Sequence, residues 1–220
     1  MRDLIGDYFS AAEHERIRQA VEAAEGQTAG EIVPYAVVAS DDYSETAWKA
    51  ATLAALAAAL AAAGLHGLGG FWGVGGYMWL GLPTAVGAAV GYLAGARIPW
   101  LKRLLVAPVV AERQVERRAA LAFIEEEVFF TRERTGILIF VSVFERQVLI
   151  LGDSGINAKV EPEEWGEIVA EIAAGIAVGK PADALVEGIG KCGALLERRG
   201  VEIRPDDIDE LSDELRTHDR

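Results

Sequence analysis

Between Lys49 and Arg97 the chain carries no Asp, Glu, Lys or Arg, and most of the residues there are Ala, Gly or Leu. A helix needs about 20 apolar residues to cross the hydrocarbon core of a bilayer. The charge-free stretch is long enough for two crossings joined by a turn. We therefore predict a transmembrane helical hairpin over residues 47–96. Its parts are a first span near Ala47–Leu65, a glycine-rich turn at Gly64–Gly70 and a second span near Tyr77–Ala96.

An Ala-rich helical pair buried in a soluble core is the alternative, but the local pattern favours a membrane. Gly87, Gly91 and Gly95 recur every four residues, as on helix faces that pack closely in lipid. Pro83 is tolerated better in a membrane helix than in most soluble ones. Amphipathic rings, which prefer the membrane interface, lie near the ends of the predicted spans. They are Trp48, Trp72, Tyr77, Trp79 and Trp100.

Cations at the flanks predict the orientation of this hairpin. Lys49 borders one end, Arg97, Lys102 and Arg103 border the other, and the turn has no cation apart from a protonated His66. The positive-inside rule then places both termini in the cytoplasm and only the turn outside, in a two-span protein of the cell membrane. The mixed basic and apolar segment 97–105 suits the membrane interface. We expect no signal peptide before it.

The remaining sequence predicts one split domain. Residues 1–46 and 97–204 have the length of an ordinary globular domain, and the acidic residues 205–220 read as a disordered tail. A net charge of −13 with no basic stripe argues against nucleic-acid binding. The single cysteine, Cys192, excludes an internal disulfide and a cysteine-based zinc site.

Periodicity and capping signals predict an α/β fold, an α/β/α layered sandwich with a mixed sheet. A capping box at Ser10 and Glu13 starts the first helix. Pro34, which has no N–H to donate, predicts an edge position or a bulge in the first strand. The other expected elements are strands at Glu31–Ser40, Gly136–Phe144 and Gln147–Asp153, a candidate short strand at Val201–Ile203, and helices at Val109–Arg132, Pro162–Val178 and Pro181–Arg198.

Several short segments within residues 4–42 and 119–196 together form a recognisable pattern. The segments are Phe9-Ser10, Thr28-Ala29-Gly30-Glu31-Ile32-Val33, Thr135-Gly136-Ile137-Leu138-Ile139-Phe140-Val141-Ser142, Arg146-Gln147-Val148-Leu149-Ile150 and Gly152-Asp153-Ser154-Gly155-Ile156. This pattern resembles the TPM domain family, named after a thylakoid lumen protein, a photosystem protein and a receptor modulator.

This resemblance implies an α/β/α sandwich, frequent membrane anchoring, an acid phosphatase activity and, in some members, divalent cations held by acidic loops. The chain departs from the family at the loop before the second of these strands. That loop is usually rich in Asp, whereas here it is Arg132-Glu133-Arg134-Thr135-Gly136. The exchange of acids for arginines argues against a metal at this loop and against metal-assisted phosphatase chemistry.

Two motifs match catalytic patterns by their letters alone. Gly152-Asp153-Ser154-Gly155 has the form of a serine-protease nucleophile segment, but the chain offers only His14 and the tail residue His218 as a base outside the hairpin. Cys192 and Arg198 have the spacing of a tyrosine phosphatase motif, yet they lie in a helical pattern rather than a phosphate-binding loop. We interpret the first as a turn and Cys192 as a buried apolar residue.

Topology supplies a better candidate site. If the first two strands are parallel and the third is antiparallel to the second, three loops meet at the sheet edge away from the membrane. Glu31 and Asp153, with Asn157, are hard oxygen ligands suited to Ca²⁺ or Mg²⁺. Arginines in the same loops suit a phosphate or carboxylate. A third possibility is that these charges neutralise one another. The candidate ligand-binding residues are Glu31, Arg132, Arg134, Thr135, Asp153, Ser154 and Asn157.

Two functions remain open. The first is a non-enzymatic module, anchored in the lipid bilayer, that docks partners, including membrane proteins, on its cytosolic loop edge. The second is a weak phosphomonoesterase that uses the same edge. The absence of a nucleophile with a base, and of a set of several carboxylates, places the enzyme second.

Overall fold

The computed structural model describes residues 8–69, 76–203 and 210–218. The chain divides into two compact units: residues 1–41 with 112–220, here called the α/β unit, and residues 42–111, here called the helical unit. The helical unit is thus an insertion within the sequence of the α/β unit. It is longer at both ends than the hairpin predicted for residues 47–96.

A four-stranded mixed sheet forms the centre of the α/β unit, in the order β3-β2-β1-β4. β1 (Glu31–Val37) pairs in parallel with β2 (Gly136–Ser142), and β2 pairs antiparallel with β3 (Gln147–Gly152). The predicted α/β class, the mixed sheet and the relative directions of the first three strands are confirmed. β1 and β2 are buried over their full length, as expected for central strands covered on both faces.

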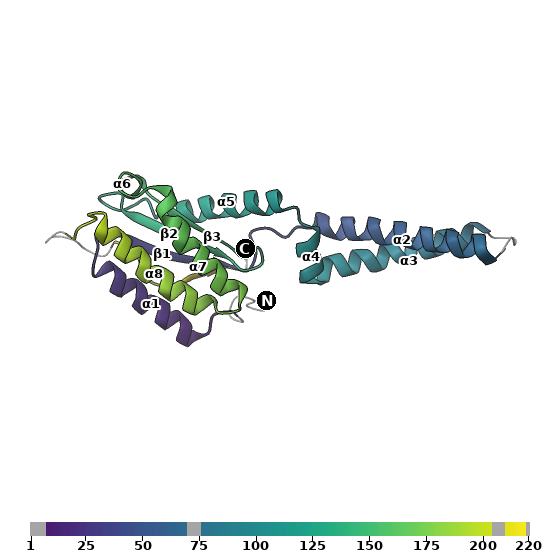
Figure 1. The fold of residues 1–220 in the computed structure, drawn as a ribbon, viewed down its shortest axis with the longest axis horizontal. Coiled ribbons are helices and arrows are strands. Elements are labelled where there is room, and N and C mark those ends of the chain that lie inside the picture. The colour runs from purple at the N-terminus through teal and green to yellow at the C-terminus, as the bar shows by residue number, and fades with distance from the viewer. Residues whose placement is uncertain (1–7, 70–75, 204–209, 219–220) are drawn as a thin grey trace. The chain divides into compact units, whose positions relative to one another are not determined.

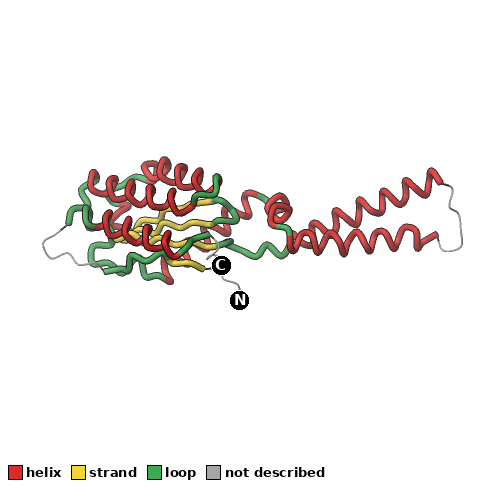
Figure 2. Tube along the Cα trace, turned by 90° about the horizontal axis from the view of Figure 1, so that it is seen from below, coloured by secondary structure: helices red, strands yellow, loops and turns green. Residues whose placement is uncertain are grey.

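Helices cover both faces of this sheet (Figures 1 and 2). Alternate residues of β1 and β2 point to opposite faces and build two separate apolar clusters. Ile32, Ile137 and Ile139 lie in the cluster formed with three helices, α1 (Ala11–Glu25), α7 (Trp165–Ala177) and α8 (Pro181–Arg198). Val33 and Leu138 lie in the smaller cluster formed with α5 (Pro108–Glu125). Two short helices follow β3, α6 (Ser154–Asn157) and the 3₁₀ helix η2 (Pro162–Glu164).

Pro34 lies in a central strand, not in an edge strand, and the hydrogen-bond pattern explains why the sheet accepts it. The Glu31 N–H donates to the Thr135 carbonyl on the β2 side, 3.2 Å away. The backbone N–H and C=O groups of the even-numbered residues of β1 therefore face the other side. There β4 (Arg216–His218) begins to pair only at Tyr35. The missing N–H of Pro34 therefore removes no hydrogen bond between strands of the sheet.

Two element boundaries differ from the predictions. The helix expected to reach Arg132 ends at Glu125, because Glu127 takes a left-handed φ of 52° and the Val128 N–H turns back to the Phe123 carbonyl at 3.1 Å. Val201–Ile203 is not a strand. Instead, the Val201 carbonyl accepts hydrogen bonds from the Ala29 N–H and the Thr28 hydroxyl.

The prediction of a disordered tail over residues 205–220 is wrong for the part of the tail that the structure describes. Residues 216–218 form β4, which pairs in parallel with β1 from Tyr35 to Val37. Leu215 is buried in the larger apolar cluster, and the Arg216 Nε lies 3.2 Å from the Glu126 carboxylate. Acidic composition suggested disorder, but one leucine and an ion pair anchor the segment.

The helical unit contains α2 (Glu45–Gly69), α3 (Gly76–Arg97), α4 (Pro99–Leu105) and the first residues of α5, up to Ala111. α2 and α3 lie side by side (Figure 2). A Cβ atom added at Gly91 would lie 2.5 Å from the Ala50 carbonyl and 2.6 Å from the Ala54 Cβ. A Cβ at Gly87 or Gly95 would likewise come within 2.8 or 2.7 Å of an atom of α2. The glycines spaced every four residues thus form the contact face between the two helices.

The turn between these helices differs from its predicted position. α2 continues through Gly64 and Gly67 to Gly69, so the turn predicted at Gly64–Gly70 is mostly helix. Glycine lowers helix stability by about 1 kcal/mol per residue, but it does not by itself end a long apolar helix. The connection at residues 70–75, which includes the interfacial candidate Trp72, lies outside the described residues.

Candidate functional site

The loop edge predicted as a binding site is assembled by backbone hydrogen bonds between three segments. The Glu31 N–H donates to the Thr135 carbonyl at 3.2 Å, which joins the start of β1 to the loop before β2. The Asp153 N–H donates to the Gly136 carbonyl, and the Gly155 N–H to the Arg134 carbonyl, both at 2.9 Å. The structure therefore brings the three predicted loops together at one end of the sheet.

Asp153 and Arg134 form an ion pair at the centre of this edge. The Arg134 Nε lies 2.9 Å from the Asp153 Oδ2, and the Asp153 side chain is only 7% exposed. The other carboxylate oxygen caps α6 by accepting the Ser154 N–H at 2.6 Å. Arg134 also stacks over the Phe129 ring and donates to the Phe129 carbonyl at 3.1 Å. Asp153 and Arg134 thus both have partners within the protein.

Glu31 forms hydrogen bonds with the C-terminal segment. Its two carboxylate oxygens accept the N–H groups of Glu210 and Leu211, each at 3.4 Å, and the side chain is buried. The Arg132 N–H donates to the Glu210 carboxylate at 2.9 Å. Glu31 and Arg132 therefore hold the residues that lead into β4, a role that the sequence did not indicate.

The remaining candidates complete the loop rather than form a cavity. Thr135 is buried, and its N–H donates to the Thr131 hydroxyl at 2.9 Å. The Asn157 side chain donates to the Gly152 carbonyl at 2.6 Å. Gly155 has no room for a side chain, because a Cβ there would overlap the Glu133 and Arg134 carbonyls. The close approach of these loops explains the glycine after Ser154.

Among the residues that the structure describes, no group of three or more His, Cys, Asp or Glu side chains is placed to hold a metal ion. Glu31 and Asp153, the predicted metal ligands, each have the protein partners given above. Binding of a divalent ion would require both carboxylates to exchange these partners. The geometry fits mutual neutralisation of charges better than a preformed cation site.

Cys192 is inaccessible, which agrees with its interpretation as a buried apolar residue. It lies inside α8 and is fully buried, and burial raises the pKa of its thiol to about 12. The thiolate that a phosphatase nucleophile requires is therefore strongly disfavoured.

A second cluster of polar side chains lies on the face of the sheet that α5 covers, and sequence reasoning missed it. Tyr35 in β1 is fully buried and stacks between Phe140 and His218, with ring centroids 5.7 and 5.0 Å away. Arg118 of α5 donates to its hydroxyl and lies over its ring. Burial raises the pKa of the Tyr35 hydroxyl. The available signal was a tyrosine in an apolar strand, since a buried tyrosine hydroxyl needs a partner.

Arg118 and β4 extend this cluster to the surface. Arg118 pairs with Glu125 at 3.1 Å, and Glu126 lies 3.2 Å from Arg216 and 4.0 Å from His218. Each arginine thus has a carboxylate partner. The cluster fixes β4 against β1 and leaves no uncompensated charge for a ligand among these side chains.

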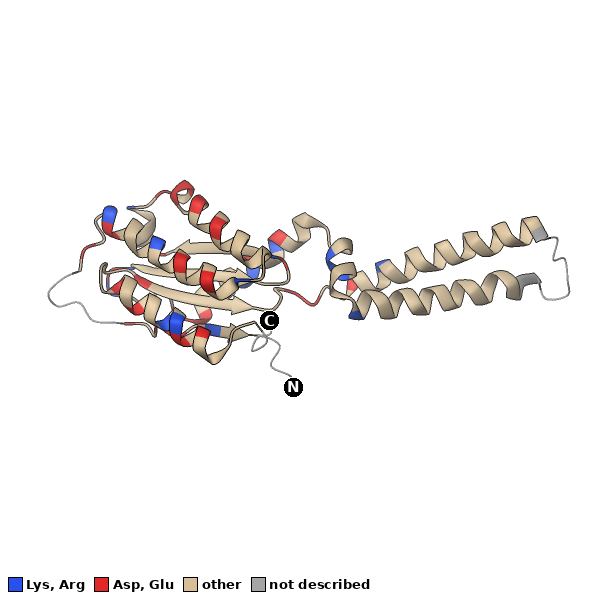
Figure 3. Ribbon diagram, turned by 60° about the horizontal axis from the view of Figure 1, so that its bottom comes forward, with Lys and Arg blue, Asp and Glu red and all other residues tan. Residues whose placement is uncertain are grey.

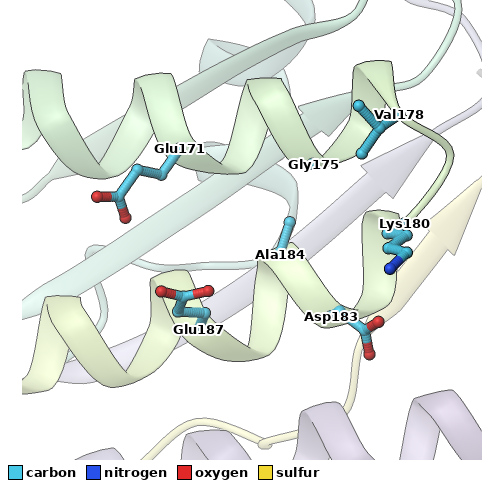
Figure 4. Close-up of a pocket in the computed structure, with 7 residues that line it drawn as sticks. All are labelled: Glu171, Gly175, Val178, Lys180, Asp183, Ala184 and Glu187. Atoms are coloured by element: carbon cyan, nitrogen blue, oxygen red, sulfur yellow. The ribbon is translucent and has the colours of Figure 1, made fainter.

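A hollow of about 180 Å³ lies between α7 and α8 (Figure 4). Asp183 and Lys180 lie at one end of it, and Glu171 and Glu187 at the other. Asp183 pairs with Arg16 at 2.7 Å, and both glutamates pair with Lys191. Because these pairs already neutralise the carboxylates, the hollow is a surface feature of the helix packing rather than a cation site.

Comparison with known proteins supports the fold class. The α/β unit defines an α/β protein with a mixed four-stranded sheet and helices on both faces. A similar solved structure is the NMR structure of the BA42 protein from the psychrophilic bacterium Bizionia argentinensis, with a TM-score of 0.58 and 21% sequence identity over 96% of each chain. At this identity the similarity shows a shared fold. No protein-family model and no curated protein matches the sequence.

Proposed function

We propose that this protein is a membrane-anchored binding module, in which α2 and α3 cross the bilayer and the α/β unit binds a partner. One observation carries the proposal: two long apolar helices pack on each other through glycine and alanine and expose nearly all their remaining surface. In the most apolar 18-residue segment of each helix, the buried share is only 6% for α2 and 11% for α3. A core helix of a soluble protein would be mostly buried.

The distribution of charged and exposed apolar residues supports the same arrangement. The charged residues of the two helices, Glu45 and Lys49 in α2 and Arg97 in α3, lie at the same end of the pair, where Figure 3 colours them. Leu53, Leu56 and Leu60 of α2 are more than half exposed. A soluble protein rarely leaves so large an apolar surface uncovered, whereas lipid chains would cover it.

The segment after α3 fits an interfacial position. α4 has no buried residue, and Trp100 and Leu104 are 67% and 72% exposed. Lys102 and Arg103 lie two and three residues after Trp100, as in helices that lie at the headgroup level. With Lys49 and Arg97, these cations support our proposal, by the positive-inside rule, that both termini lie in the cytoplasm.

The proposal keeps the resemblance to the TPM family and places binding before catalysis. The phosphatase activity that the resemblance implies needs a nucleophile or a metal, and the loop edge holds its carboxylates in contacts with Arg134 and the C-terminal segment. Purified full-length protein in detergent should therefore show no hydrolysis of para-nitrophenyl phosphate, with or without Mg²⁺ or Ca²⁺. Metal-dependent turnover would favour the phosphomonoesterase instead.

Topology reporters test the anchor. Fusions before Met1 and after Arg220 should both report a cytoplasmic location, and a tag inserted after His66 should be accessible from outside the cell. Alkaline carbonate should leave the protein in the membrane fraction. Release by carbonate would contradict the spanning hairpin, and an external terminus would contradict its orientation.

A further inference from the structure

The outer edge of β3 is an open sheet edge. β3 is the last strand of the order β3-β2-β1-β4, and within residues 8–69, 76–203 and 210–218 its residues 147–152 pair only with β2. The Asp153 N–H donates to the Gly136 carbonyl. The backbone groups of the odd-numbered residues of β3 therefore bond to β2, and those of the even-numbered residues point away from the sheet. The backbone N–H and C=O groups of Val148 and Ile150 thus face away from the sheet, while Asn157 covers the Gly152 carbonyl.

This edge lies at the bottom of an apolar groove. Two adjoining hollows of about 350 and 270 Å³ follow β3, and Val148, Leu149 and Val169 line both of them. From α7, Trp165, Gly166, Val169 and Ala173 line the groove, and a Cβ at Gly166 would meet no atom within 4 Å. The groove has space beside the strand for a further extended segment.

β3 also lacks the features that usually protect an open edge. The strand sequence is Gln-Val-Leu-Ile-Leu-Gly, without proline, lysine or any other charge. Proteins normally protect exposed edges with charged residues, proline or bulges, because an unpaired apolar strand recruits another one. The described C-terminal strand β4 lies at the opposite edge, so it does not cover β3.

Charge at the rim of the groove selects the kind of strand that fits. Glu112 and Glu116 of α5 line the groove, are exposed and make no ion pair within the described part of the chain. Arg146, directly before β3, is the one cation among the described residues that line either hollow. A second copy would bring two acidic rims together in a chain of net charge −13, whereas a basic strand would neutralise them.

We propose that the β3 edge binds an extended peptide segment with alternating apolar and basic residues, which adds to the sheet as a fifth strand. Backbone bonds to Val148 and Ile150 provide affinity, apolar side chains enter the groove, and lysine or arginine side chains meet Glu112 and Glu116. This inference rests on the proposed binding-module function and names the surface and the partner chemistry.

Synthetic peptides test the proposal with the full-length protein in neutral detergent micelles. A fluorescent octapeptide of alternating valine and lysine should bind, as measured by anisotropy, and its glutamate counterpart should bind at least about ten-fold more weakly. N-methylation of one set of alternate amides in the valine–lysine peptide should abolish binding. Methylation of the other set should not, because only one side of an added strand faces the edge.

Protein variants locate the binding site. The double substitution E112Q/E116Q should weaken the valine–lysine peptide about five-fold, whereas the matched pair E197Q/E202Q, exposed residues that line neither hollow, should leave binding unchanged. I150P removes an outward N–H and should also weaken binding. NMR shifts of the Val148 and Ile150 amides on titration provide a readout that does not depend on these substitutions.

Three outcomes would overturn the inference. The first is that the valine–lysine peptide does not bind. The second is that both methylated peptides lose the same amount of binding affinity. The third is a β3–β3 contact between two copies, detected by cross-linking at Gln147. Any of them would leave the membrane anchor unaffected, since carbonate extraction and reporters test the anchor separately. Carbonate release of a protein that still binds the peptide would contradict the anchor alone.

Discussion

At the scale of single residues, both carboxylate oxygens of Asp153 at the loop edge have structural roles. Asp153 caps α6 with one oxygen and pairs with Arg134 through the other, while Arg134 takes a left-handed φ of 59°. A non-glycine residue adopts this backbone conformation at a cost, which its contacts must offset. The ion pair and the contacts with Phe129 supply such compensation.

Substitution of Asp153 separates this structural role from metal binding. Asp153→Ala should lower the free energy of unfolding by about 1–2 kcal/mol, because the cap and the ion pair are both lost. Asp153→Asn keeps an oxygen for the cap and should cost less than about 1 kcal/mol. Urea unfolding measures both. If instead Ca²⁺ raises the melting temperature of the wild type and not that of Asp153→Asn, the carboxylate is a metal ligand.

Tyr35 predicts a loss of stability at alkaline pH. Burial raises the pKa of its hydroxyl above the unfolded value of about 10, so the folded state holds this proton more tightly. The corresponding stability is complete below pH 10 and is lost as the pH rises through the higher folded pKa. Unfolding free energies between pH 8 and 11 should fall more steeply for the wild type than for Tyr35→Phe. Equal slopes would show that Tyr35 does not cause the loss.

At the scale of elements, the glycines of α3 differ in what they contact. Gly91 touches the backbone of α2, whereas a side chain at Gly81 in the same helix would meet no atom within 4 Å. The interface therefore depends on where a glycine lies along the helix and not on glycine content. Close backbone approach through small residues is the main source of helix association when lipid surrounds both partners.

Valine at these two glycines tests the interface. Gly91→Val should separate α2 from α3, since its Cβ would lie 2.5 Å from the Ala50 carbonyl, and should speed amide exchange in α2. Gly81→Val adds the same side chain to the same helix and should leave exchange unchanged. Hydrogen exchange followed by mass spectrometry in micelles measures both. Similar protection in the two variants would contradict the close packing at Gly91.

At the scale of the whole molecule, the α/β unit is built from sequence on both sides of the helical insertion. β1 precedes the insertion and β2 follows it, yet the two strands pair along their full length and have a common buried core. The split unit should therefore fold without the insertion. In a protein with residues 42–111 replaced by a flexible glycine–serine linker, Asp41 and Glu112 become linker neighbours.

This shortened protein should be soluble, with a mixed α/β circular dichroism spectrum and one cooperative unfolding transition. The physical reason is that its apolar contacts lie within the unit itself. Persistent aggregation or gradual unfolding would show that the helical unit is needed for folding.

The sequence by itself determined the apolar helical pair, the class of fold and the directions of three strands, because these follow from charge-free length and from local periodicity. It also indicated which loops meet at the candidate edge. Only the tertiary structure decided what those side chains do: Glu31 holds a segment nearly 180 residues away, and Asp153 pairs with Arg134. The pairing of β4 with β1 and the contacts of Tyr35 were also decided only by the tertiary structure. Contacts between residues so far apart in the chain depend on packing, which local patterns do not encode.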